Sequence, residues 1–137
     1  MRVRREDGTA AVEFVLVAPA LILVLAAIVG AGRVVSTKSA VLDVAREAAR
    51  AAADAPDAST AEAVAASRAK EVAAGHGLDP NRLTIEQDPG SFDRGTAYTI
   101  DVIYRVELSD LPALGFLPGS FAVSAHHAEL TDRYKSR

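Results

Sequence analysis

FVLVAPALILVLAAIVGAG, residues 14–32, is the stretch of this sequence that decides its fold. It contains 19 consecutive residues without a charge. At 1.5 Å per residue a helix of this length spans about 28 Å, close to the thickness of the hydrocarbon core of a bilayer. A chain of only 137 residues has too little material to cover so apolar a helix on all sides. The sequence therefore favours a membrane-spanning helix over a buried helix of a soluble protein.

The composition limits what the rest of the chain can do. The length leaves room for a single domain, and a net charge of −3 gives no sign of nucleic-acid binding. Cysteine is absent, which excludes disulfides, cysteine metal sites and a thiol nucleophile. Aromatic residues are few, so we expect a thin core in the part outside the membrane.

The charges that flank the apolar run do not decide its orientation. Arginines precede the run together with two acidic residues: Arg2, Arg4 and Arg5 with Glu6 and Asp7. Arg33 and Lys38 follow it, so the positive-inside rule is nearly balanced. A short tail ahead of a long C-terminal domain is typical of a signal anchor, which favours a cytoplasmic N-terminus and an exported C-terminal domain.

A glycine and a glutamate stand just before the apolar run. Gly8 ends a short charged leader, and Glu13 is the fifth residue after it, followed by Phe14. This pattern resembles the precursors of type IV pilin-like proteins, which have a leader ending in glycine and a glutamate at the fifth position. More narrowly, GTAAVEFVLVAPALILVLAAIV, with GRVV and VAREAARAAA further on, resembles the TadE-like family over residues 4–53.

The resemblance implies a minor pilin-like component (a pseudopilin) of a bacterial tight-adherence (Flp) type IV pilus assembly or secretion system, and not an enzyme. The implied partners are the membrane, a prepilin peptidase, other pilin-like subunits and the pilus assembly platform, without nucleic acid or cofactor. The peptidase would remove residues 1–8. Residues 9–32 would then form the transmembrane half of the first helix and residues 33–137 an exported α+β domain, held in the cell membrane or in a pilus.

The residues around the implied cut suit that chemistry. Gly8 has no side chain, so its backbone can enter a peptidase site closely, and an unstructured leader end would be easy to extend. Cleavage would expose an ammonium on Thr9, one helical turn from Glu13. A carboxylate at the membrane edge is costly unless it is paired, so we expect Glu13 to pair with that ammonium in its own or a neighbouring subunit. The alternative is a Glu13 carboxylate that simply reaches water.

Other residues of the span affect its shape. Pro19 leaves the carbonyl of Val15 without its helical hydrogen bond, which predicts a kink. Two pairs of small residues permit close helix contact, namely Ala26 with Gly30 and Ala27 with Ala31.

Apolar residues at helical spacing continue beyond the span, which predicts one helix from Thr9 to Ala53. Its apolar face consists of Val34, Val41, Val44, Ala45, Ala48 and Ala52. Pro56 ends the helix, and a second helix is expected to begin at Ser59 or Thr60, where Ser59-Thr60-Ala61-Glu62 has the form of a capping box. The second helix should end at Gly75-His76-Gly77 and pack on the first through alanine, Val64 and Val72.

The period then changes to that of strands. Three strands are predicted, at residues 82–86, 96–108 and 120–130, with a turn at Asp88-Pro89-Gly90. One face of the second strand is apolar, comprising Tyr98, Ile100, Val102, Tyr104, Val106 and Leu108. The whole pattern predicts an α+β, pilin-like fold in which a long helix and a second helix carry a small antiparallel sheet.

No catalytic or metal-binding pattern is found in the sequence. His126 and His127 are neighbours in a predicted strand and point to opposite faces, so they do not suit one metal ion. His76 lies between two glycines, as in a surface loop. Two other functions stay open beside the pilin-like one. They are an unprocessed, membrane-anchored envelope binding module, and a secreted domain released by an ordinary signal peptidase near Ala31.

Overall fold

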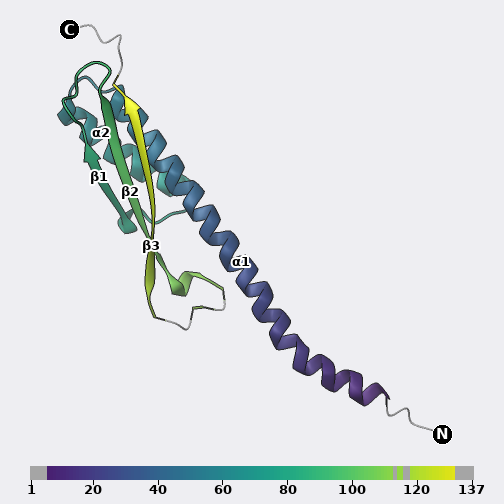
Figure 1. The fold of residues 1–137 in the computed structure, drawn as a ribbon. Helices are drawn as coiled ribbons and strands as arrows, with labels where there is room; N and C mark the ends of the chain where they lie inside the picture. Colours follow the sequence, from purple (N-terminus) through teal and green to yellow (C-terminus); the bar gives the residue numbers. More distant parts are fainter. Residues whose placement is uncertain (1–5, 113, 116–117, 132–137) are drawn as a thin grey trace.

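The computed structural model describes residues 6–112, 114–115 and 118–131, and it has the predicted α+β layout (Figure 1). Its elements are α1 (Glu6–Ala53), α2 (Ala58–Gly75), β1 (Leu83–Asp88), β2 (Ala97–Glu107) and β3 (Ser120–Leu130). Two short 3₁₀ turns, η1 (Pro80–Arg82) and η2 (Leu108–Asp110), precede β1 and follow β2.

Helix α1 is a single element of 48 residues. It ends at Ala53 as predicted, and the N–H of Ala55 turns back to the carbonyl of Ala52 ahead of Pro56. The helix is already formed at Glu6, the first residue that the structure describes, three residues before the expected start at Thr9.

The start of α2 differs from the prediction. The helix begins at Ala58, and its cap is Asp57 rather than Ser59 or Thr60. The Asp57 carboxylate accepts hydrogen bonds from the N–H of Thr60 at 2.9 Å and from the hydroxyl of Ser59 at 2.6 Å. An ionised carboxylate accepts more strongly than a hydroxyl, so the residue ahead of the apparent capping box takes its role.

The three strands form an antiparallel sheet in the order β1-β2-β3. Leu83 lies opposite Tyr104, and Ala97 lies opposite Leu130. Along β2 every second residue is buried against the helices: Tyr98, Ile100, Val102, Tyr104 and Val106. Leu108, expected on this face, lies instead in η2, where the strand has already ended.

Alanine forms most of the core between the two helices. The fully buried residues of α2 recur every four positions: Ala61, Ala65, Ala69 and Ala73. They face a second buried set on α1, which consists of Val41, Val44, Ala45, Ala48, Ala49 and Ala52. Such small side chains let two helices approach closely. Val64, expected in this face, lies beside the alanine stripe and is 39% exposed.

The sheet covers the same half of α1 and α2, so helices and strands share one core. These elements form a compact head at one end of α1, and the N-terminal half of α1 projects from it (Figure 1).

Candidate functional site

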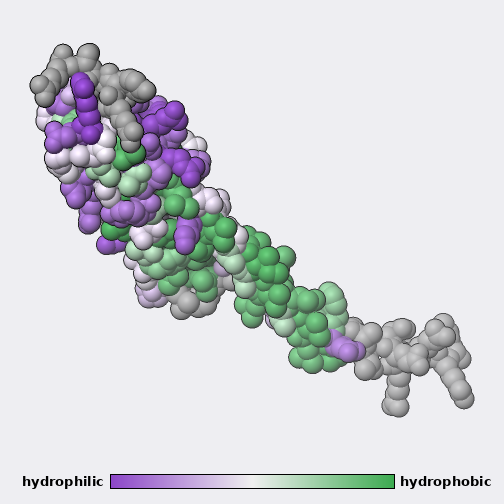
Figure 2. All heavy atoms as spheres, turned by 45° about the horizontal axis from the view of Figure 1, so that its top comes forward, coloured by the Kyte–Doolittle hydropathy of each residue, from purple (hydrophilic) through white to green (hydrophobic). Residues whose placement is uncertain are grey.

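The projecting half of α1 is an apolar surface without a protein cover. Its large side chains are exposed, and they include Phe14, Leu16, Leu21, Ile22, Leu23, Leu25 and Ile28. Among the described residues α1 is the one helix long and apolar enough to cross a membrane, and only 6% of its most apolar window is buried. A core helix of a soluble protein would be mostly buried, so that alternative is wrong. Figure 2 shows the apolar surface continuing from the head along the projecting helix.

The residues of the implied processing signal lie at the far end of this helix. Gly8 and Thr9 belong to the first turns of α1, so the leader end is helical there rather than unstructured. Glycine within a helix costs about 1 kcal/mol relative to alanine, so Gly8 weakens this part of α1.

Glu13 and Phe14 are exposed and belong to the N-terminal half of α1. This half of the helix projects from the head (Figure 1). The helical backbone places position 13 one turn from position 9, which is the spacing that the predicted pairing requires. Pro19 lies within α1, and the helix continues on both sides of it.

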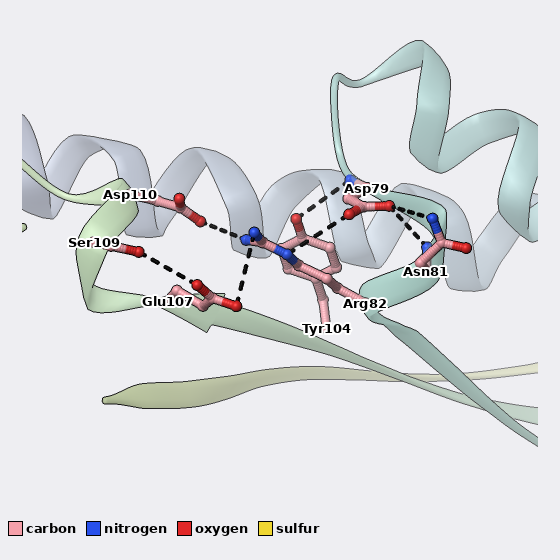
Figure 3. Close-up of polar contacts among 7 residues, drawn as sticks. All are labelled: Asp79, Asn81, Arg82, Tyr104, Glu107, Ser109 and Asp110. Carbon is pink, nitrogen blue, oxygen red and sulfur yellow. Dashed lines mark hydrogen bonds and ion pairs between the residues drawn. The ribbon is translucent and has the colours of Figure 1, made fainter. Parts of the chain in front are cut away.

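A charged cluster lies at the base of the head, where β2 ends and β1 begins (Figure 3). The guanidinium of Arg82 is its centre. It donates from Nη1 to Asp110 at 2.6 Å, and it forms ion pairs of 3.7 Å with Glu107 and with Asp79. The hydrogen bond to Asp110 is the main cause of a raised pKa at Arg82, so this cation keeps its proton.

The cluster holds three segments of the chain together. Asp79 caps η1 and Arg82 ends it just before β1, Glu107 ends β2, and Asp110 closes η2. The N–H of Asp79 also donates to the hydroxyl of Tyr104 at 3.3 Å. All the charged members are partly exposed, and exposed ion pairs contribute little each. The arrangement suits positioning of the β2–β3 connection.

An apolar groove of about 440 Å³ lies below this cluster. One wall belongs to α1 and consists of Leu23, Ala26, Ala27, Gly30, Ala31 and Val34. The other wall is the β2–β3 connection, through Leu111, Pro112 and Leu114, named here the apolar turn. Both predicted pairs of small residues thus face this groove. The sequence pattern does not predict this groove, because it joins segments that are about 80 residues apart in the chain.

The histidines and the buried tyrosine have structural partners. Nδ1 of His126 lies 2.9 Å from Asp101, and Nε2 of His127 lies 3.3 Å from Glu129. Burial raises the pKa of Tyr98 to about 12, and its hydroxyl donates to Gln87 at 2.6 Å. No group of three residues that could hold a metal ion occurs in the described part of the chain.

Residues 8–50 match the family model described as TadE-like protein. The predicted resemblance to the TadE-like family is therefore confirmed, and the match lies within the predicted residues 4–53. No curated protein and no solved structure matched the chain. A TadE-like segment together with an exposed apolar N-terminal helix fits a single-pass membrane anchor in a pilin-like protein associated with a Tad pilus.

Proposed function

We propose that this TadE-like protein is a minor pilin-like subunit of a tight-adherence (Flp) pilus assembly or secretion system, processed by a prepilin peptidase between Gly8 and Thr9. One observation carries the proposal. The family match begins at Gly8 and covers the helix whose large apolar side chains are uncovered. An uncovered apolar helix needs either lipid or neighbouring helices around it. A pilin-like subunit is surrounded by lipid in the membrane and by the helices of other subunits in an assembly.

The domain division follows from the same helix. Residues 1–8 would be the leader, residues 9–32 the transmembrane half of α1, and residues 33–137 the exported domain. We place the N-terminus in the cytoplasm because a short tail ahead of the span is typical of a signal anchor. The charges on the two sides of the span are nearly balanced and do not decide the orientation. In this arrangement the partners of the span are the peptidase, other pilin-like subunits and the assembly platform.

Glu13 and Phe14 would serve recognition during assembly. After cleavage the ammonium of Thr9 would lie one turn from the carboxylate of Glu13, within the same subunit or in a neighbour. Pairing removes most of the cost of holding a carboxylate at the edge of hydrocarbon. Pro19 would let the span bend as it changes surroundings.

The N-terminus of the protein extracted from membranes tests the processing step. Mass spectrometry should find a chain that begins at Thr9. An intact leader would instead support an unprocessed envelope binding module. A start near Ala31 or Gly32 would support a secreted domain released by an ordinary signal peptidase.

A pair of glycine variants makes the test sharper. Gly8→Val places a β-branched side chain before the cut, and we expect it to leave the leader uncleaved. Gly32→Val is the matched control, because a Cβ at Gly32 meets no heavy atom within 4 Å in the fold. The control should still begin at Thr9. If Gly8→Val is cleaved after residue 8 as efficiently as the control, the prepilin interpretation is wrong.

A further inference from the structure

The apolar turn is an unusual feature for the surface of an exported domain. Leu111 is buried, Pro112 is half-buried and Leu114 is 38% exposed, and all three face the groove beside α1. Figure 1 shows that the β2–β3 connection lies at the end of the sheet nearest the projecting half of α1. The backbone there bonds to itself, since the N–H of Leu111 donates to Leu108 and that of Leu114 to Leu111. These bonds lower the cost of moving the turn out of water.

The position of the groove along α1 sets its depth relative to the membrane. Its α1 wall runs from Leu23 to Val34, which corresponds to about 16 Å along the helix axis. This stretch includes the C-terminal half of the apolar run 14–32. If that run crosses the bilayer, the apolar turn lies beside its last turns, at the level of the outer leaflet.

A polar layer lies directly above the groove. A neighbouring pocket is lined by the charged residues Arg33, Asp79, Arg82 and Asp110, together with Thr37, Gly77 and Leu78 and residues of β2. Arg82 is paired with three carboxylates, those of Asp79, Glu107 and Asp110, whereas Arg33 forms no ion pair with any residue that the structure describes. The apolar side chains of the groove would lie at the depth of the acyl chains, and the guanidinium of Arg33 at the depth of the phosphate headgroups.

We propose that the apolar turn is a second membrane contact, which dips into the extracytoplasmic leaflet so that lipid acyl chains fill the groove and Arg33 meets headgroup phosphates. The proposal rests on the membrane-spanning role of α1. Lipid is favoured as the occupant because the groove is continuous with the exposed apolar surface of the span (Figure 2). Protein does not fill it, since a Cβ built on Gly30 meets no heavy atom within 4 Å.

A second contact would change how the head sits on the membrane. One helix leaves a head free to tilt and rotate, whereas an anchored turn fixes the side of the head that faces the lipid. The charged cluster around Arg82 would then hold the turn in the orientation needed for insertion.

Tryptophan fluorescence tests this proposal on the full-length protein, because the natural chain contains no tryptophan. Leu114→Trp is placed in nanodiscs of phosphatidylcholine with brominated acyl chains, which quench only nearby indoles. We expect loss of most of its fluorescence relative to unbrominated discs. Leu130→Trp is the matched control, because Leu130 is also an exposed leucine but lies at the opposite end of the sheet. Its fluorescence should not change.

A third variant separates failure of this proposal from failure of the membrane anchor. Ile22→Trp lies in the exposed face of the span, so brominated lipid should quench it whenever α1 is inserted. If Ile22→Trp is quenched and Leu114→Trp is not, the second contact is refuted while the anchor stands. If neither is quenched, both fail. Lipid quenching of Leu114→Trp that disappears as more copies are loaded per disc would assign the groove to a second copy and overturn the lipid assignment.

Discussion

Glu13 is the residue on which the proposed assembly role most directly depends. We expect Glu13→Gln to be cleaved normally and to begin at Thr9, because the substituted position lies beyond the cut. Its neutral amide cannot form the ion pair with the Thr9 ammonium, so copurification with other pilin-like subunits should be lost. Mass spectrometry of the N-terminus and affinity purification from membranes measure the two effects separately.

Glu86→Gln is the control for this experiment. Glu86 is an exposed carboxylate on the outer face of β1, and the same change of charge there should leave copurification intact. Normal copurification of Glu13→Gln would show that the carboxylate merely reaches water at the membrane edge.

Asp57 offers a pH-dependent test of the head. Hydrogen bonds from Ser59 and Thr60 lower the pKa of its carboxyl below the ordinary 3.8. Since the folded pKa is lower than the unfolded one, the cap stabilises the fold above the unfolded pKa and is lost as pH falls through the folded value. Asp57→Ala should therefore melt at a lower temperature than the natural protein at neutral pH, and the difference should vanish in acid.

Asp54→Ala serves as the control, since Asp54 is a neighbouring exposed carboxylate at the C-terminal end of α1, where its backbone N–H donates to Arg50 and a change of side chain leaves that bond in place. Thermal unfolding followed by circular dichroism at several pH values compares the three proteins. An Asp57→Ala deficit that stays constant across the acid range would contradict the cap mechanism.

The contact between α1 and α2 is the element that depends most on residue size. Ala65 is fully buried in the alanine stripe, so Ala65→Leu forces the two helices apart. Overpacking of this kind costs about 1–3 kcal/mol of unfolding free energy. Ala63→Leu, at an exposed position of the same helix, should have almost no effect. Denaturant unfolding of both variants measures the difference, and equal stability would show that the interface is looser than its alanines imply.

The elements that were predictable are those specified by local pattern. Periodicity, together with breakers such as Pro56 and the turn at Asp88-Pro89-Gly90, placed the end of α1 at Ala53, the two helices, and the three strands within a few residues of their limits. The cap of α2 was missed because Ser59 and Thr60 satisfy a general motif, while the stronger acceptor, Asp57, precedes it. Local pattern decides where an element lies, but the chemistry of a single side chain decides its first residue.

The other missed features join segments that are distant in sequence. The cluster around Arg82 links residues 28 apart, and the groove links the span to the β2–β3 connection. Neither follows from periodicity, because the register of a sheet on a helix is set by packing of the whole head. Gly8 and Thr9, the residues of the proposed processing site, are the opposite case. The sequence alone suggests their role, and the fold adds only their place near the N-terminal end of α1.

At the scale of the whole molecule, the environment of α1 and the side on which the head lies can be tested together. The natural chain has no cysteine, so single substitutions give unique labelling sites. Ser67 lies exposed on α2 in the head, and Leu25 is 63% exposed in the projecting half of α1. A membrane-impermeant maleimide applied to intact cells should label Ser67→Cys and not Leu25→Cys.

The comparison is informative because both positions are open in the isolated fold, so only lipid or neighbouring subunits can protect Leu25→Cys. Detergent solubilisation should restore its labelling if lipid was the cover, and neighbouring helices of a filament would keep it protected. Labelling of Ser67→Cys only after permeabilisation would place the head in the cytoplasm and reverse the orientation. Labelling of both sites in intact cells would show that the apolar half of α1 lies outside the bilayer. That result is incompatible with a membrane anchor.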